Sequence, residues 1–331
     1  MRIAAKNPTS LPAGSVCLID LTGFLHRLAY MTGPHGMDPT KVTSKKTGEP
    51  TWGLVGTFNQ LNTLAKLGPA RIIAFADSSR DGFRQELLPT YKRKSGNPYI
   101  RQQLDRLDNC LPHLGIPVLG AREEFPGMEA EDLIAKTVMD FTELVVIVSY
   151  DKDLLQLVGP KASHYNPQKK QLVEAASIDE VLRTQFMPTK ATLTGPDLAV
   201  FLAVTGDETD GVKPIGGIGR ATLGWYYEKL PEGLSNPEKI EALAGVDREI
   251  KFVNSKPVTA DWRQALINLQ ATDLQAERQR SIQLGHIPDL KPTKEAFHAV
   301  LEELTMGSFL KNYDAWFAPF ARLNQPPMEM S

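Results

Sequence analysis

The sequence is poor in cysteine and has no long apolar run. Its 331 residues include two cysteines, Cys17 in a predicted strand and Cys110 in a predicted helix. We expect both to be small core residues and not a disulfide, as is usual in a reducing cytoplasm. No stretch approaches the roughly 20 apolar residues of a membrane span, and the N-terminus lacks the apolar core of a signal peptide. These absences argue against a secreted disulfide scaffold and indicate a cytoplasmic protein.

Neither sign of charge is in excess, since 37 Lys and Arg oppose 39 Asp and Glu, for a net charge of −2. The chain therefore lacks the overall basic charge of many nucleic-acid-binding proteins, although a concentrated acidic site can mask basic patches. The six histidines have no zinc-type spacing, and we expect them on the surface or hydrogen-bonded in the core. An apolar content of 42% suffices for a sizeable core, and the length predicts about two domains.

Acidic residues occupy a repeated position, at the ends of apolar segments or in short clusters. The nine carboxylates of this kind are Asp20, Asp77, Glu129, Glu131, Asp132, Asp151, Asp153, Asp207 and Asp210. Three apolar runs of strand length, residues 16–20, 71–77 and 144–151, each end in one of them. In an open α/β sheet the carboxyl ends of the strands border one ligand crevice. The sequence therefore predicts a shared acidic pocket at one edge of a sheet.

Two local spacings support this pocket. Asp151 and Asp153 are two residues apart, so in an extended segment both side chains would point the same way. Glu129 and Asp132 lie three apart at the start of a helix predicted from 129 to about 141, which places them on one face. Acids are favoured in the first turn of any helix, so these positions alone do not establish a site.

Like charges in one crevice are costly unless cations neutralise them. Hard divalent ions that prefer oxygen ligands, Mg²⁺ or Mn²⁺, are therefore the expected complement. Simpler interpretations exist for single acids: Asp20 and Asp77 would cap strand ends, and Glu131 would be a solvated helix residue. The number of acids that follow the same pattern favours the metal site.

The remaining pattern predicts strands alternating with helices, then a helical region. Apolar spacing predicts a helix over residues 52–67, and a strand, helix and strand in this order predict a parallel crossover. Residues 153–158 predict a short helix, and residues 163–173 a hairpin around Asn166-Pro167. Ser177 and Glu180 form a capping-box pattern that opens another helix. Beyond residues 194–196 the chain is expected to be helical apart from loops.

Basic and aromatic residues alternate between residues 80 and 106. This segment has seven Lys or Arg against three Asp or Glu, with Phe83, Tyr91 and Tyr99 interleaved. Cations neutralise phosphates and aromatic rings stack on unpaired bases, so the pattern is typical of a single-strand contact surface. The alternative is a solvated charged face.

A glycine-rich stretch follows Asp207 and Asp210 directly. It contains Gly216, Gly217 and Gly219 and leads into a helix predicted from about Arg220. Glycine permits close backbone approach, and the free N–H groups at a helix N-terminus bind anions. The stretch therefore predicts a phosphate-binding loop beside the acidic cluster.

Taken in order, these motifs resemble the flap endonuclease and 5′-3′ exonuclease family, which includes the 5′ nuclease domain of bacterial DNA polymerase I and phage 5′ nucleases. The resemblance extends over residues 16–312. The matching segments are residues 18–20 with 25–27, Phe83-Arg84 with Tyr91-Lys92, 127–132, 151–157, 206–210, 217–219 and 302–310. Because a polymerase segment is lacking, we expect a stand-alone enzyme of a phage or a bacterium.

The resemblance implies an α/β fold of the PIN-like (5′ nuclease) type. It consists of a mostly parallel sheet flanked by helices, a helical arch and a C-terminal helix-three-turn-helix subdomain. The expected division is a catalytic domain over residues 1–190, with the arch at about 80–108, and a helical DNA-binding subdomain over residues 191–331. The helix-three-turn-helix is expected at about 197–230. The packing of Trp225, Tyr226 and Tyr227 among the C-terminal helices is also expected.

The resemblance also implies roles for the acids, residue by residue. A tighter metal site would contain Asp20, Asp77, Glu129, Glu131 and Asp132, and a second site Asp151, Asp153, Asp207 and Asp210. Two divalent ions about 3.5–4 Å apart would activate water and stabilise the leaving 3′ oxygen, giving a 5′-phosphate product. Asp20 and Asp77 are thus expected to be catalytic. Glu131 departs from the family, which usually has Asp there.

Basic residues complete the implied site. Lys92 and Arg84 would stabilise developing phosphate charge at the base of the arch, and Tyr91 would stack on a base. The expected DNA contacts are Arg84, Tyr91, Lys92, Arg93, Lys94, Gly217, Gly219 and Arg220. Relatives complete the helix-three-turn-helix with a monovalent cation, so K⁺ is expected there. Ser95 stands where the family often has Arg.

The implied function is a structure-specific 5′ nuclease of replication or repair. Its expected substrates are 5′ flaps, nicks and duplex ends of DNA, and RNA primers in RNA·DNA hybrids. We expect a monomer in the cytoplasm of a bacterium or a phage-infected host, with replication proteins as further partners. An inactive structure-specific DNA-binding protein is the alternative, but it would lack carboxylates and none is missing. A small PIN-like ribonuclease would lack the arch and the glycine loop.

Overall fold

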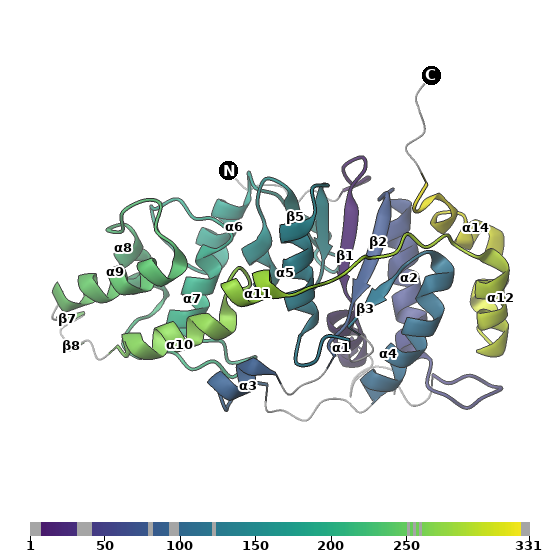
Figure 1. The fold of residues 1–331 in the computed structure, drawn as a ribbon, viewed down its shortest axis with the longest axis horizontal. Helices are drawn as coiled ribbons and strands as arrows, with labels where there is room; N and C mark the ends of the chain where they lie inside the picture. Colours follow the sequence, from purple (N-terminus) through teal and green to yellow (C-terminus); the bar gives the residue numbers. More distant parts are fainter. Residues whose placement is uncertain are drawn as a thin grey trace, which may run out of the picture.

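The computed structural model describes residues 8–31, 42–78, 82–92, 99–120, 124–249, 252–253, 256–257 and 260–325. A sheet lies in the middle of the molecule with helices on both of its faces (Figure 1). A helical lobe forms one end of the molecule, and C-terminal helices, among them α12 and α14, form the other. Among the described residues, no helix is both long and apolar enough to span a bilayer.

The sheet has the order β3-β2-β1-β4-β5-β6. All neighbouring strands pair in parallel except β5 and β6, which form the predicted hairpin. The strands are β1 (Val16–Asp20), β2 (Arg71–Phe75), β3 (Val118–Leu119), β4 (Val145–Val148), β5 (Ala162–Asn166) and β6 (Gln171–Val173). The mostly parallel sheet and its three predicted central strands are confirmed. Their almost purely apolar sequences follow from burial on both faces.

Helices in the first half of the chain surround this sheet. They are α1 (Leu21–Met31), α2 (Trp52–Lys66), α3 (Phe83–Leu87), α4 (Tyr99–Cys110) and α5 (Ala130–Asp140), with 3₁₀ helices η2 (Leu111–Leu114) and η3 (Asp153–Leu157). The helices predicted at 52–67, 129–141 and 153–158 are thereby confirmed. The third is a 3₁₀ helix.

The second half is helical except for a short hairpin that the pattern did not predict. The helices are α6 (Ile178–Gln185), α7 (Asp197–Thr205), α8 (Arg220–Tyr227), α9 (Asn236–Glu249), α10 (Trp262–Thr272), α11 (Glu277–Ser281), α12 (Lys294–Glu303), α13 (Gly307–Leu310), α14 (Tyr313–Phe317) and η4 (Phe320–Arg322). The hairpin pairs β7 (Phe252–Val253) with β8 (Lys256–Pro257). Helix α6 begins where predicted, but the Ser177 hydroxyl bonds to the backbone of Glu174 and does not cap the helix.

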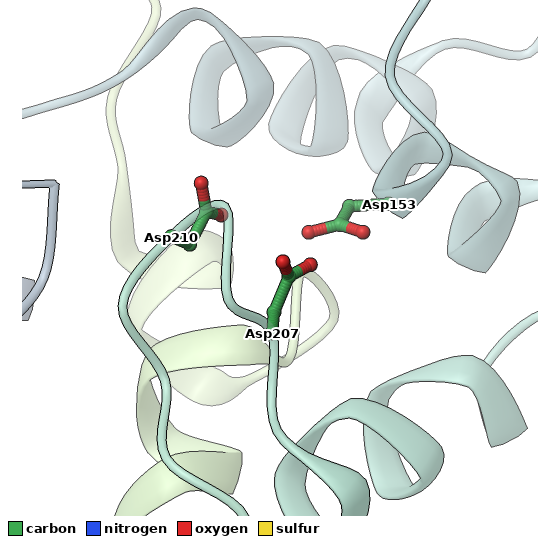
Figure 2. A group of neighbouring side chains, drawn as sticks. All are labelled: Asp153, Asp207 and Asp210. Atoms are coloured by element: carbon green, nitrogen blue, oxygen red, sulfur yellow. The ribbon is translucent and has the colours of Figure 1, made fainter.

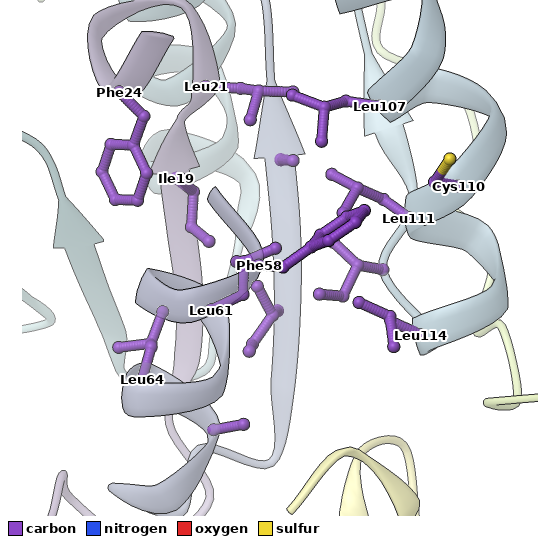
Figure 3. Close-up of a cluster of buried hydrophobic side chains, with 14 of the residues drawn as sticks. Ile19, Leu21, Phe24, Phe58, Leu61, Leu64, Leu107, Cys110, Leu111 and Leu114 are labelled. Atoms are coloured by element: carbon purple, nitrogen blue, oxygen red, sulfur yellow. The ribbon is translucent and has the colours of Figure 1, made fainter. Parts of the chain in front are cut away.

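Alternate residues of the strands supply two separate cores. Ile19 and Cys17 of β1 belong to a cluster with α1, α2 and α4, and in Figure 3 Phe58 of α2 lies between Ile19 and Leu111. Leu18, on the opposite face, packs with α5 and with residues 274–287. Both cysteines are buried and free, as predicted. A third cluster holds α6 to α10 together.

The C-terminal helices do not follow the predicted division of the chain into two domains at residue 190. Phe297, Phe309 and Phe320 are buried in the same cluster as Ile19, so α12 to α14 belong to the core of the sheet domain. The ring of Phe297 lies 5.1 Å from that of Phe58, edge to face. The chain therefore leaves the sheet domain, forms the helical lobe, and returns. Apolar spacing predicts a helix, but it does not say which core that helix joins.

Candidate active site

The ends of β1, β2 and β4 deliver three of the predicted acids to one edge of the sheet. Asp20 is the last residue of β1, and Asp77 and Asp151 lie just beyond β2 and β4. Their parallel register aligns these ends. Asp20 Oδ1 accepts a hydrogen bond from Gly23 N at 2.7 Å. Asp77 Oδ1 accepts one from Ala130 N at 2.9 Å, which joins β2 to the start of α5.

Ser149 is a site residue that the sequence did not reveal. Its hydroxyl donates to Asp20 Oδ2 at 3.0 Å and accepts from Asp151 N at 2.9 Å, so it links the ends of β1 and β4. It follows β4 directly and is fully buried. Only its place between an apolar run and an acid could have indicated this role.

Asp153, Asp207 and Asp210 form a second acidic group. Each offers one carboxylate oxygen, and these oxygens all lie within 4.8 Å of one another. Figure 2 shows the carboxylates of Asp153 and Asp207 pointing toward one another, with Asp210 beside them. Lys152 contacts Asp207 and lies 3.2 Å from Asp153 Oδ1. The structure therefore brings together three acids that lie on η3 and on the loop between α7 and α8.

Asp151 and Asp153 do not share an extended segment, contrary to the expectation. Asp153 opens η3, and its N–H donates to Asp151 Oδ1 at 2.8 Å. The short Asp side chain satisfies a backbone donor two residues ahead, and this local bond starts a turn in place of a strand. The two carboxylates still lie close enough for the charge of Asp151 to raise the pKa of Asp153, after burial as the main cause.

Glu129, Glu131 and Asp132 at the start of α5 form a third acidic group around Arg84, which is almost fully buried. Its guanidinium donates to both oxygens of Asp132 at 2.7 and 2.8 Å. The same group lies 3.0 Å from Glu131 and 3.6 Å from Glu129. Burial, the largest single effect, would lower the pKa of Arg84, but the charges of Asp132, Glu129 and Glu131 together outweigh it and raise the pKa above its usual value. A paired, permanently charged guanidinium therefore holds these three acids together.

Both carboxylate oxygens of Asp132 accept hydrogen bonds from other protein groups, whereas the resemblance implies that Asp132 binds a metal ion. Besides Arg84, its oxygens accept hydrogen bonds from Glu129 N at 3.0 Å and Gln279 Nε2 at 2.9 Å. Burial, the largest single effect, favours its neutral form, but the charge of Arg84 and the hydrogen bonds from Arg84, Glu129 and Gln279 together lower the pKa of Asp132. The four hydrogen bonds use both oxygens. Gln279 lies outside every motif, and no sequence signal indicated it.

Lys92 and Tyr91 approach the same acids from the segment after α3. Lys92 Nζ donates to Glu129 Oε2 at 2.7 Å, and Tyr91 Oη donates to the same oxygen at 3.1 Å. Lys92 N donates to Asp210 O at 3.0 Å, so the segment bridges two acidic groups. Lys92 has a φ of 42°, a left-handed conformation that is uncommon outside glycine. Predicted contacts Arg93 and Lys94 lie outside the described residues.

Negative charge exceeds positive charge at this sheet edge. In the described part of the chain, three cations contact the carboxylates, namely Arg84, Lys92 and Lys152. Burial and neighbouring carboxylates raise the pKa of Asp20 to about 7. Burial also raises the pKa of Asp210 to about 6. A raised pKa means that the charged carboxylate is disfavoured, so cations placed beside Asp20 and Asp210 would stabilise their charged forms.

The glycine loop exposes its backbone at the start of α8. Gly216 and Gly217 have φ values of 84° and 68°, which other residues rarely adopt. A Cβ added at Gly219, the residue before α8, would meet no atom within 4 Å. Arg220 donates to the backbone carbonyls of Phe186 and Gln185, so its guanidinium anchors the loop to the end of α6.

The aromatic residues of α8 divide between core and surface. Tyr226 and Tyr227 are buried in the helical lobe, as expected. Trp225 is 44% exposed, so the expectation that it packs among the helices is wrong. Lys229 Nζ lies 4.4 Å from the centre of its ring. Consecutive residues of a helix differ by about 100° around its axis, so Trp225 faces solvent although Tyr226 and Tyr227, the next two residues, face the core.

A mostly parallel sheet with acids gathered beyond its strand ends is consistent with a phosphodiester hydrolase, and comparisons give the family. The chain matches the family described as 5′-3′ exonuclease, N-terminal resolvase-like domain, over residues 15–184. The 5′-3′ exonuclease of Aquifex aeolicus is 28% identical over 310 residues, which cover 91% of this chain and 95% of that protein. The chain belongs to the 5′-3′ exonuclease family.

One further relative in sequence and one solved structure of the same fold are similar to this chain. DNA polymerase I of Pseudomonas aeruginosa is 26% identical over 304 residues, which cover 88% of this chain and 31% of that protein. A mutant of the T5 5′-exonuclease shares the fold, with a TM-score of 0.53 at 15% identity over 94% of this chain and 99% of that one. The protein is a 5′ nuclease, a hydrolase of phosphodiester bonds.

Proposed function

We propose that this 5′ nuclease cleaves DNA with two divalent metal ions, both as a 5′-3′ exonuclease and as a flap endonuclease. The observation that carries the proposal is the meeting of two groups of carboxylates at one sheet edge. One group lies at the ends of β1 and β2 with the start of α5, and the other is formed by Asp153, Asp207 and Asp210. Such paired acidic groups suit two-metal phosphodiester hydrolysis.

The side chains fit hard divalent cations. All donors are carboxylate oxygens, the ligands that Mg²⁺ and Mn²⁺ prefer. Within the described residues, the buried Oδ1 of Asp153 makes no hydrogen bond, although Lys152 Nζ lies 3.2 Å away. The proposed ligands are Asp20, Asp77, Glu129 and Glu131 for one ion and Asp151, Asp153, Asp207 and Asp210 for the other. When bound, the ions supply an activated water and a counter-charge for the leaving 3′ oxygen.

Lys92 is the proposed electrostatic catalyst. Its ammonium group already lies at the carboxylates, 2.7 Å from Glu129, while its side chain remains 36% exposed. A phosphate that enters the site would meet this cation, which would stabilise the charge that develops in the transition state. Arg84 acts differently, because it is buried and paired with Asp132. We assign Asp132 and Arg84 the role of holding Glu129 and Glu131 in place.

We propose a role for Tyr91 other than the expected stacking on a DNA base. Its ring is buried with Leu88, Val212 and Ala271, and its hydroxyl contacts Glu129. Stacking on a DNA base would require the ring to leave this cluster. We therefore propose that Tyr91 orients Glu129 in the DNA-free protein.

Duplex DNA is proposed to bind at the glycine loop. The exposed backbone around Gly217 and Gly219 allows phosphates to approach the start of α8 without reading sequence. A related fold, the T5 D15 flap endonuclease, is known as a complex with DNA and metal ions at a TM-score of 0.51. We further propose K⁺ at this loop, RNA·DNA hybrids as substrates, a monomeric enzyme, and replication proteins as partners.

One cleavage assay tests this function. A 5′ flap, a nicked duplex, a single strand and an RNA-primed duplex, all labelled, would be incubated with Mg²⁺, with Mn²⁺ or with a chelator. We expect metal-dependent cleavage of the flap and the nicked duplex, with 5′-phosphate products. Tight, structure-specific binding without cleavage would instead identify an inactive DNA-binding protein.

A further inference from the structure

The short helix α11 touches the active site although it belongs to none of the sequence motifs. Gln279 is 1% exposed and donates to Asp132 Oδ1 at 2.9 Å, across 147 positions of sequence. The neighbouring Arg278 places its guanidinium 3.5 Å from the centre of the Phe83 ring. In Figure 1, α11 lies beside α5, the helix that carries Asp132. Two consecutive residues of α11 therefore hold two different elements, α5 and α3.

Arg84 connects these two contacts. Its guanidinium forms the bidentate pair with Asp132, and its Nε donates to the carbonyl of Ala271 at the end of α10 at 2.8 Å. The Phe83 ring lies 4.9 Å from the Arg84 guanidinium and is covered by Arg278. A bidentate pair needs a carboxylate plane in a fixed orientation. Besides Glu129 N, Gln279 supplies a further donor that holds this plane.

The segment that Arg84 anchors also carries Lys92. Between them, Leu88 N bonds to Arg84 O at 2.8 Å and Tyr91 N bonds to Leu88 O at 2.8 Å. The position of Lys92 Nζ over Glu129 therefore depends on where α3 lies. Movement of Asp132 or of Phe83 would be transmitted to Lys92 over one short, hydrogen-bonded segment.

We infer that Arg278 and Gln279 are positioning residues that hold residues 83–92 in place, so that Lys92 faces Glu129. This inference rests on the proposed function for its catalytic part. The contacts themselves are independent of that function. Arg278 covers the Phe83 ring from an exposed position, and the buried Gln279 donates a hydrogen bond to Asp132. Neither residue touches the reacting atoms.

Two variants and a matched control test this inference. Arg278→Leu removes an exposed guanidinium from Phe83, and Gln279→Leu removes the donor to Asp132. Arg280→Leu removes the same kind of charge from another exposed position of α11 and is the control. Hydrogen exchange of residues 83–92 would be measured without DNA, and single-turnover cleavage and DNA affinity would be measured with Mg²⁺.

We expect faster exchange over residues 83–92 in both variants and unchanged exchange in β4. Single-turnover cleavage by Gln279→Leu should fall about tenfold, as for loss of one hydrogen bond to a charged group. Cleavage by Arg278→Leu should fall by a smaller factor, because that variant loses one cation–π contact at an exposed position. In both variants the Kd for DNA should change less than about twofold. Because Arg278 is exposed, its variant should fold normally even if Gln279→Leu does not. Unchanged exchange, or faster exchange with undiminished cleavage, would overturn the inference. Absence of cleavage by the unaltered protein would contradict the proposed function. The exchange result would still show whether Arg278 and Gln279 hold residues 83–92 in place.

Discussion

At the scale of single residues, we propose that the site contains two kinds of residue: carboxylates that bind metal ions, and residues that hold those carboxylates in place. Asp153 and Asp210 belong to the first kind, since their oxygens converge with those of Asp207. Asp132 and Ser149 belong to the second, because their hydrogen bonds go to other site residues. This distinction gives each class of substitution a different expected result.

Loss of one carboxylate from the Asp153 group should abolish chemistry but not binding. Asp153→Asn or Asp210→Asn removes one negative charge from the proposed metal-binding group and changes none of the residues that we propose to contact duplex DNA. We expect turnover to fall by about a hundredfold or more, with duplex affinity nearly unchanged. Single-turnover cleavage and fluorescence anisotropy would measure the two quantities. Parallel loss of binding and turnover would refute the assignment to metal binding.

Removal of the Lys92 ammonium should act mainly on the transition state. Lys92→Ala breaks the contact of 2.7 Å to Glu129 and leaves a partly exposed position, so the fold should tolerate the change. We expect the single-turnover rate to fall by roughly a hundredfold, with a much smaller change in DNA affinity. An unchanged rate would show that Lys92 is only a counter-ion for Glu129.

The raised pKa values predict that Mg²⁺ stabilises the protein more at higher pH. The folded-state pKa of Asp20 is about 7 against an ordinary 3.8, and that of Asp210 is about 6. Without metal, these two groups make the protein less stable as pH rises from about 4 to 7, because the folded state holds more protons. Metal ions compete with these protons.

We therefore expect Mg²⁺ to raise Tm little at pH 5.5 and by a few degrees at pH 8. A stabilisation of about 2.7 kcal/mol is expected at 100 times the Kd, and it shifts the Tm of a protein of this size by a few degrees. Thermal unfolding with Mg²⁺ and with a chelator measures the difference at each pH. The buried His164, whose pKa is lowered to about 4, titrates in the opposite direction. Its effect cancels in that difference. Equal stabilisation at both pH values would contradict the prediction.

At the scale of elements, the proposed role of the glycine loop and α8 in binding duplex DNA can be tested separately from the chemistry at the acidic site. Gly219 has an ordinary φ of −92° and open space beside it, so Gly219→Val should not disturb the fold. The added branches would still obstruct a phosphate at the helix start. We expect flap and nicked duplex to bind about tenfold more weakly, whereas cleavage of a short single strand changes little.

The matched control for this element is Gly159→Val. Gly159 likewise has open space beside it, but it lies in the loop after η3. Gel-shift titration of both variants with both substrates would decide the role of the loop. Equal losses on duplex and single strand for Gly219→Val would indicate general disruption, which thermal unfolding would reveal.

The elements themselves were largely predictable, but their ends were less so. The strand at Val16–Asp20 and the helix after residue 52 follow from runs and periods of apolar residues. The turn from Asp151 into the short helix at Asp153 was not predicted, because it depends on a hydrogen bond from Asp153 N to the side chain of Asp151. The exposed Trp225 was also missed, since an aromatic residue has the same appearance in sequence whether it faces a core or solvent.

At the scale of the whole molecule, the return of the chain to its first core predicts that residues 1–190 do not fold alone. This fragment lacks Phe297, Phe309 and Phe320, which are buried against β1 and α2. Loss of one buried Phe typically costs about 3–5 kcal/mol, and total stability is typically about 5–15 kcal/mol. We expect no cooperative thermal unfolding transition. A chain that ends at Gln325 retains these residues and is the control; a folded, soluble fragment of residues 1–190 would contradict the prediction.

The sequence by itself determined the central strands, the acids beyond their ends and the glycine loop, because these features depend on residues close together in the chain. Only the tertiary structure decided that Asp132 pairs with Arg84 and Gln279, which lie 48 and 147 positions away. The same holds for the helices after residue 293, which join the first core. Such contacts arise from the packing of several elements at once, and apolar periodicity specifies that a face is buried but not which partner buries it.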